Sequence, residues 1–245
     1  MRDPFPGVTY LLSYNMELYE EITMKKLSNL AVLLLFVVSL LFSGCGASAP
    51  ESTAGKTGGD LLLVIDMQNA YTPEGPWTCP RIDQAAENIV SLIESGTFEK
   101  IILTRFDAPT APVGTWNDYN EINRDVNEDV YLNEIIPQLK VYEDVYPMYS
   151  KSTYSSMTIP EVRSAATECI ERGGSVVVTG VVSECCVIAT ALEAVDMGCP
   201  VIYLKDACAG ADDALEQSVV DILSVLDYVQ TTILDTDEYL QDKAA

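Results

Sequence analysis

Histidine is absent from the 245-residue sequence, and this absence removes several classes of active site. Without an imidazole, neither a Ser–His–Asp nor a Cys–His nucleophilic arrangement can be built, and neither can the usual histidine-bound zinc site. Basic residues are scarce, with 14 Lys and Arg against 37 Asp and Glu and a formal net charge of −23. Because a chain this acidic repels nucleic acid and anionic membrane surfaces, no nucleic-acid partner is expected. The sequence also has no internal repeat and no Gly-rich phosphate loop.

The most informative segment is residues 176–210, VVVTGVVSECCVIATALEAVDMGCPVIYLKDACAG. It is typical of a buried strand, a glycine turn, a cysteine pair, a helix and a second buried strand. Cys186 falls in the first turn of the predicted helix, just past the carboxyl end of a strand. The partial positive charge and unpaired N–H groups of a helix amino terminus favour a thiolate over a thiol. The pattern therefore predicts that Cys186 is a nucleophile and that the protein is a hydrolase.

Two further runs supply an acid and a cation at strand ends. Residues 61–66, LLLVID, form an apolar run that ends in Asp66 and suits a strand buried on both faces. Residues 146–151, YPMYSK, form a shorter run that ends in Lys151. Ligands bind beyond the carboxyl ends of the strands in an open parallel sheet. Asp66, Lys151 and Cys186 are therefore expected to converge on one pocket.

Strands alternate with helices across residues 60–245, which predicts one α/β domain of three layers. We expect a mostly parallel, six-stranded, Rossmann-like sheet that helices cover on both faces. The predicted strands lie near residues 60–66, 100–105, 145–150, 175–180, 200–205 and 228–234, and the clearest helices near 81–97, 159–173, 185–198 and 211–226.

Several short motifs occur in order along the chain: D-M-Q from Asp66, T-R from Thr104, K-S-T-Y-S-S from Lys151, T-G-V-V-S-E-C-C-V from Thr179, T-A-L-E-A from Thr190 and K-D-A from Lys205. In these motifs and their order the chain resembles the isochorismatase-like cysteine hydrolases over roughly residues 59–240. The resemblance implies the isochorismatase-like hydrolase fold and an Asp–Lys–Cys catalytic triad at Asp66, Lys151 and Cys186. Ser183 and Glu184 stand where the family pattern has Thr and Asp, and Cys185 falls where the family varies, so we interpret Cys185 as a packing residue.

The triad suggests an amidohydrolase that acts through a thioester. Lys151 would stabilise the thiolate and the ionised Asp66, which would accept the thiol proton and return it to a leaving amine. Backbone N–H groups of Val182 and Cys186 would form the oxyanion hole. The resemblance also implies a cis peptide near Val181–Val182 that shapes this hole.

The long segment 104–123, TRFDAPTAPVGTWNDYNEIN, is expected to be an irregular, aromatic loop that determines the substrate. Nicotinamidases of the family that the chain resembles carry a metal ion in this region, bound by Asp and several His. This segment has no histidine, and a carboxylate-only site around Asp107 has no supporting spacing, so we expect an enzyme independent of metal and of any cofactor. The candidate substrate-binding residues are Tyr71, Trp77, Arg105, Phe106, Trp116 and Tyr119.

The amino-terminal region predicts a location outside the cytoplasm. Residues 24–45 combine Met24-Lys25-Lys26, an apolar stretch and Ser-Gly-Cys, as in a lipoprotein signal peptide whose Cys45 is acylated after cleavage. A single transmembrane anchor is the alternative, but about 16 apolar residues are few for crossing a bilayer. Residues 1–23 are acidic and precede the signal, which suggests that translation begins at Met24. Residues 46–59 read as a flexible tether.

The sequence therefore predicts an extracytoplasmic, lipid-anchored, metal-independent cysteine amidohydrolase that acts on a small-molecule amide. The lipid is the only membrane contact expected, and the resemblance implies a homo-oligomer. Two alternatives stay open: a non-catalytic lipoprotein that keeps the fold and binds a small ligand, and a nicotinamidase-like enzyme.

Overall fold

A computed structural model describes residues 59–244 of the chain. The predicted signal peptide, Cys45, the proposed start at Met24 and nearly all of the predicted tether lie outside the described residues. Among the residues that are described, no helix has the length and apolar character needed to span a bilayer.

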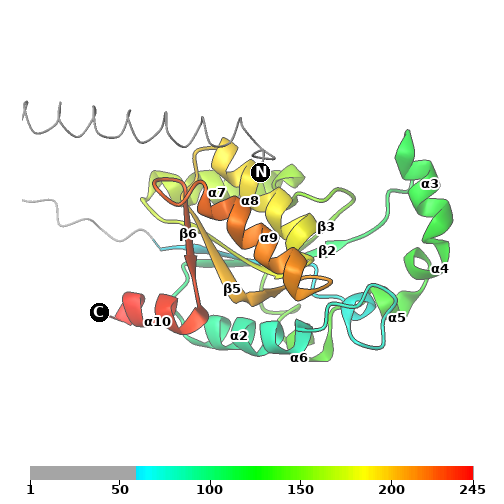
Figure 1. The fold of residues 1–245 in the computed structure, drawn as a ribbon, viewed down its shortest axis with the longest axis horizontal. Helices are drawn as coiled ribbons and strands as arrows, with labels where there is room; N and C mark the ends of the chain where they lie inside the picture. Colours follow the sequence, from blue (N-terminus) through cyan, green and yellow to red (C-terminus); the bar gives the residue numbers. More distant parts are fainter. Residues whose placement is uncertain (1–58, 245) are drawn as a thin grey trace, which may run out of the picture. The chain divides into compact units, whose positions relative to one another are not determined.

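A single six-stranded sheet forms the centre of the domain, in the order β3-β2-β1-β4-β5-β6 (Figure 1). All five strand pairs are parallel, which confirms the predicted α/β class. The strands are β1 (Leu61–Ile65), β2 (Lys100–Phe106), β3 (Met148–Lys151), β4 (Val176–Val181), β5 (Val201–Ala209) and β6 (Thr231–Leu234).

Helices cover both faces of this sheet. The side chains of β1 therefore alternate between two apolar cores, one on each face. Leu61, Leu63 and Ile65 pack with α7 (Pro160–Glu171), α8 (Ile188–Asp196) and α9 (Asp213–Ser224). Leu62 and Val64 pack with α2 (Ile82–Glu94), α6 (Pro137–Lys140) and α10 (Thr236–Ala244). Figure 1 shows these two sets of helices on opposite sides of the strands, so the three-layer α/β/α prediction is confirmed.

The strand order reverses at β1, which pairs with β2 on one side and with β4 on the other. In open α/β sheets this reversal opens a crevice at the carboxyl ends of the two central strands. Gly180 in β4 has a φ of +110°, and a Cβ there would lie 2.1 Å from the carbonyl oxygen of Ile65. Only glycine allows β1 and β4 to approach this closely at the edge where Asp66 follows β1.

The segment expected to be an irregular loop is partly helical, and this corrects the sequence prediction. It contains α3 (Thr115–Ile122), followed by α4 (Arg124–Asn127) and α5 (Val130–Asn133), and α3 and α4 extend from one end of the domain (Figure 1). The helix α3 has no buried residue, so its sequence lacks the apolar stripe that predicts a helix. The helix α10 was also not predicted; it buries only Thr236 and Tyr239.

Candidate active site

Asp66 follows β1 directly, and its side chain is fully buried. Its φ of +52° is unusual for a residue other than glycine, although aspartate tolerates this left-handed region better than most. The hydroxyl of Thr104 donates a hydrogen bond of 2.8 Å to Oδ1, and Nζ of Lys151 lies 2.5 Å from Oδ2. Both carboxylate oxygens are therefore held by donors from the strands β2 and β3.

Lys151 ends β3, and its side chain is excluded from solvent. Besides Asp66, Nζ donates to the carbonyl oxygen of Thr153 at 3.0 Å and lies 5.5 Å from the ring centroid of Phe106. Burial lowers the pKa of Lys151, but the charge of Asp66 and the contribution of Cys186 outweigh this and raise it above its ordinary value. The ammonium therefore stays protonated at neutral pH.

Cys186 lies in η3 (Ser183–Val187), a single π-helical turn that leads into α8, and is 4% exposed. Burial raises the pKa of its thiol well above the ordinary value, the charge of Asp66 raises it further, and Lys151 opposes the rise. Desolvation thus opposes the thiolate that the helix amino terminus and Lys151 were expected to favour. The thiol lies beside the buried carboxylate–ammonium pair of Asp66 and Lys151, and its burial favours the neutral form.

The chain turns between β4 and η3 through a cis peptide bond at Val181–Val182, where the resemblance implied one. Within the described residues, the backbone N–H of Val182 has no hydrogen-bond acceptor. Val182 and Cys186 both line the same cavity. The predicted oxyanion-hole residues thus lie together at its wall.

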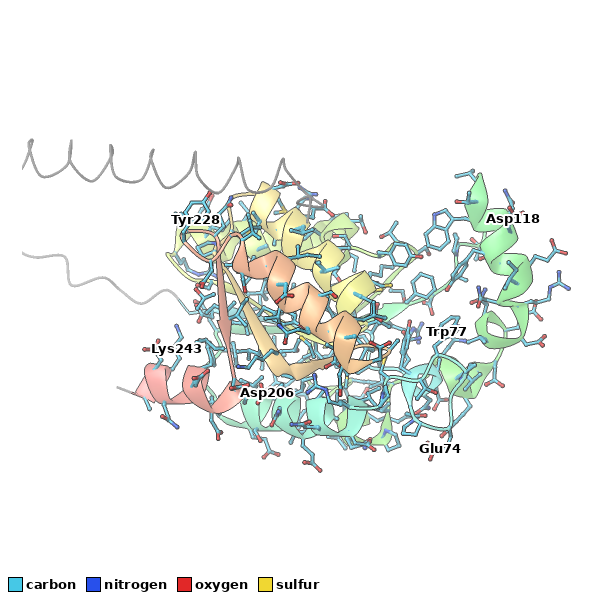
Figure 2. The ribbon with its side chains drawn as sticks, in the orientation of Figure 1. Glu74, Trp77, Asp118, Asp206, Tyr228 and Lys243 are labelled. Atoms are coloured by element: carbon cyan, nitrogen blue, oxygen red, sulfur yellow. The ribbon has the colours of Figure 1, made fainter. Side chains whose placement is uncertain are left out.

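This cavity has a volume of about 510 Å³ and opens beside Cys186. Four of the six predicted substrate-binding residues line it: Tyr71, Trp77, Phe106 and Tyr119. Figure 2 places Trp77 at the end of the domain from which α3 and α4 extend, and Lys243 of α10 at the other end. The complete lining is Tyr71, Pro76, Trp77, Thr78, Cys79, Phe106, Tyr119, Tyr154, Val182, Cys185, Cys186 and Ala211.

The other two predicted residues, Arg105 and Trp116, do not line this cavity. The guanidinium of Arg105 pairs with Asp107 at 3.1 Å and donates to Oγ of Ser150 at 3.3 Å, so it is held away from Cys186. Trp116 lines an adjacent recess and packs against Tyr119 and other rings, with centroids 5.0 Å apart for that pair. Trp116 therefore supports the wall and does not form it.

Six lining residues were not assigned to the cavity from the sequence, and two of them, Tyr154 and Cys185, carry reactive or polar side chains beside the nucleophile's position. Tyr154 stands in the K-S-T-Y-S-S run after Lys151, so a signal for it was present, because the turn after a strand end faces the crevice. Cys185 was interpreted as a packing residue, but it is half-buried and lines the cavity. The six cysteines of the described region are all free thiols.

The chain does not fit the metal site that the resemblance attributes to nicotinamidases. It has no histidine, and Asp107 is paired with Arg105. Among residues 59–244, no three His, Cys, Asp or Glu side chains are grouped closely enough to hold a metal ion. The donors that a zinc ion prefers are thus not assembled here.

The structure is thus an α/β/α domain in which Asp66, Lys151 and Cys186 lie together at the carboxyl edge of the sheet. A family model described as an isochorismatase domain matches residues 60–237, and the chain belongs to this family of hydrolases. It is 24% identical over 192 residues to an uncharacterized isochorismatase family protein, YddQ, from Bacillus subtilis (strain 168), which covers 74% of this chain and 98% of that protein.

Solved structures show the same fold. A cysteine hydrolase from Pseudomonas syringae pv. phaseolicola 1448A has a TM-score of 0.64 at 19% identity, over 81% of this chain and 99% of that one. The nicotinamidase PncA from Bacillus subtilis has a TM-score of 0.56 at 20% identity, over 71% of this chain and 99% of that one.

Proposed function

We propose that the domain is a cysteine amidohydrolase that cleaves the C–N bond of a small, uncharged amide through a thioester on Cys186. The observation that carries this proposal is the buried pair of Asp66 and Lys151, which both act on the thiol of Cys186 at the wall of the cavity. A module that only binds a ligand gains nothing from placing a carboxylate, an ammonium and a thiol together out of water, since burying charges is costly.

In the proposed acylation step, Asp66 accepts the proton of the Cys186 thiol while Sγ attacks the amide carbon. The carbonyl oxygen becomes an oxyanion next to the backbone N–H groups of Val182 and Cys186. Asp66 then gives the proton to the leaving nitrogen, the C–N bond breaks, and an amine or ammonia departs. Lys151 stays protonated and offsets the negative charge of Asp66 and of the forming thiolate.

Deacylation reverses the proton movements. A water molecule loses a proton to Asp66 and attacks the thioester carbon. The C–S bond breaks, the acid product leaves, and Asp66 returns the proton to the departing sulfur. Each cycle therefore consumes one water and restores the neutral thiol from which it began.

The lining of the cavity supports an uncharged substrate with an apolar body. Rings of Tyr71, Trp77, Phe106, Tyr119 and Tyr154 form much of the wall, and no Lys, Arg, Asp or Glu is among the lining residues in the described chain. A carboxylate on the substrate would lose its hydration without gaining a cation, because Arg105 is held by Asp107. Acidic amides should therefore be poor substrates.

Ammonia release from matched amides tests this proposal. The purified domain should hydrolyse benzamide with a kcat/KM at least about tenfold above that for the anionic 4-carbamoylbenzoate, since an unpaired buried charge costs more than about 1.4 kcal/mol. Activity should be lost in Cys186→Ala and retained in Cys185→Ala. Equal rates for the two amides would contradict the neutral substrate, and equal rates for the two variants would contradict the nucleophile.

Metal independence belongs to the same proposal, and so does the setting of the enzyme. Activity should survive prolonged treatment with a chelator, whereas a nicotinamidase-like metal enzyme would lose it.

Acylation of Cys45 would hold the domain at the outer side of the cell membrane, with the lipid as the only membrane contact. Replacing Cys45→Ala should then move the protein from the membrane fraction to the soluble fraction. A homo-oligomer is part of the proposal, and light scattering of the purified domain tests it.

A further inference from the structure

A chain of buried hydroxyl groups joins the carboxylate of Asp66 to the main chain of Cys186. Thr104 Oγ1 donates to Asp66 Oδ1 at 2.8 Å, and Ser156 Oγ lies 3.4 Å from Thr104 Oγ1. The backbone N–H of Ser156 donates to Thr190 Oγ1 at 2.9 Å, and Thr190 Oγ1 donates to the carbonyl oxygen of Cys186 at 2.7 Å. Every link joins two buried groups.

The direction of these hydrogen bonds makes Ser156 the centre of the chain. The single hydroxyl proton of Thr104 is used in its hydrogen bond to Asp66. In the 3.4 Å contact between Thr104 Oγ1 and Ser156 Oγ, the hydroxyl of Ser156 must therefore be the donor. Ser156 thus donates its hydroxyl towards the acid–base residue and its backbone N–H towards the nucleophile.

The network connects three separate parts of the fold. Thr104 belongs to β2, Ser156 begins η2 (Ser156–Thr158) just after Lys151, and Thr190 belongs to α8. All three side chains are 0% exposed, so water does not compete for these hydrogen bonds. A helical threonine often donates its hydroxyl to the carbonyl four residues earlier. Here Oγ1 of Thr190 also accepts a hydrogen bond from the backbone N–H of Ser156, which belongs to η2.

We propose that Ser156 and Thr190 are positioning residues, which keep the thiol of Cys186 aligned with the carboxylate of Asp66. This inference rests on the proposed function, since the alignment matters for a proton transfer between the two groups. Neither residue lines the cavity, so neither contacts the substrate. A misplacement of about 1 Å between reacting groups can cost about 100-fold in rate, and the loss should appear in kcat and not in KM.

Thr190→Val and Thr190→Ser test this proposal. The valine variant removes the hydroxyl at nearly constant volume, and kcat should fall at least about tenfold with KM changed less than about twofold. The serine variant keeps the hydroxyl and should restore most of kcat. Thr179→Val is the matched control, because Thr179 is also fully buried and donates 2.9 Å to a main-chain carbonyl, that of Leu63, outside the network.

The alkylation rate of Cys186 by iodoacetamide, followed by peptide mass, gives a second readout that needs no substrate. It should fall in Thr190→Val, recover in Thr190→Ser and stay at the wild-type value in Thr179→Val. If both valine variants lower Tm alike and leave kcat and alkylation unchanged, Thr190 is only structural and the proposal is wrong.

Two outcomes separate this inference from the proposed function. If no amide is hydrolysed but alkylation follows the expected order, the positioning role stands and the proposed function fails. If amides are hydrolysed but kcat is unchanged in Thr190→Val, the proposed function stands and the positioning role fails. Should Thr190→Val fail to fold, Ser156→Ala removes only the hydroxyl link to Thr104, and kcat should again fall while KM holds; an unchanged kcat would overturn the proposal.

Discussion

Nζ of Lys151 lies 2.5 Å from Oδ2 of Asp66, and the side chains of both residues are completely excluded from solvent. Such a pair is costly to desolvate and contributes little net stability, whereas removing one partner leaves a lone buried charge. Two charges buried beside Cys186, which lines the cavity, therefore indicate a chemical role more than a structural one.

Breaking this pair should cost both stability and activity. Lys151→Met leaves Asp66 unpaired in the interior, and the free energy of unfolding should fall by about 3–5 kcal/mol. The double variant Asp66→Asn/Lys151→Met removes both charges and keeps a residue that tolerates a positive φ, so much of the stability should return. Urea unfolding measures both changes.

Activity separates the two roles of the pair, because the repaired double variant still lacks the acid–base group. Its kcat should remain at least about 100-fold below that of the wild type. A double variant that regains both stability and activity would contradict the mechanism, and one as unstable as Lys151→Met would contradict the account of the buried charges.

Stability should decline at alkaline pH because buried thiols resist ionisation in the folded state. Burial raises the pKa of Cys79 from 9.0 to about 12, and that of Cys199 to about 11. Since the folded pKa is the higher one, the contribution is complete below about pH 9 and is lost as the pH rises through the folded pKa. Each such thiol should lower the free energy of unfolding by up to about 1.4 kcal/mol per pH unit in that window.

Urea unfolding between about pH 7 and about pH 10 measures this slope. Cys79→Ala should be less stable at every pH but should show a flatter alkaline decline than the wild type. Parallel curves for the two proteins would show that Cys79 makes no contribution to the decline.

Substitutions of Trp77, in the cavity wall, and of Arg105, outside the cavity, should differ in their effect on KM. Trp77→Ala removes part of the apolar wall and should raise KM for benzamide about tenfold, with a smaller change in kcat. Arg105→Ala is the matched test on a residue outside the cavity, and it should leave both constants within about twofold. A large rise of KM in Arg105→Ala would place the guanidinium at the substrate after all.

The contact between the two central strands should tolerate only glycine. Gly180→Ala forces a Cβ to 2.1 Å from the carbonyl oxygen of Ile65 at a φ of +110°, and should destabilise the domain by at least about 3 kcal/mol. Gly96 also has a positive φ, of +67°, but a Cβ there meets nothing within 4 Å, so Gly96→Ala should cost only about 1–2 kcal/mol. Similar thermal shifts in the two variants would show that the strand contact is not the constraint.

The parts of the site that were predictable from sequence are those fixed by topology. Asp66 follows β1, Lys151 ends β3 and Cys186 follows β4, and parallel strands bring such ends to one edge of the sheet. Gln68 was recognised only as part of a motif, although it exchanges two hydrogen bonds with the main chain of Phe106 and so ties the ends of β1 and β2 together. That role requires the pairing of residues 38 positions apart.

What was not predictable depends on burial and on side-chain direction. The pKa of Cys186 is set by how far it is removed from water, and no pattern in the sequence gives that quantity. The pairing of Arg105 with Asp107 is an exception, since residues two apart in an extended chain share a face. The helix α3 gave no signal, because none of its residues is buried.

Trapping the acyl-enzyme tests the central claim, that Cys186 is the nucleophile, most directly. The domain is mixed with benzamide, quenched in acid before the first turnover ends, and analysed by intact mass and peptide mapping. The account predicts a benzoyl adduct on the peptide that contains Cys186, present in Cys185→Ala and absent in Cys186→Ala. Release of ammonia by Cys186→Ala at the wild-type rate, with no adduct in any variant, would contradict it.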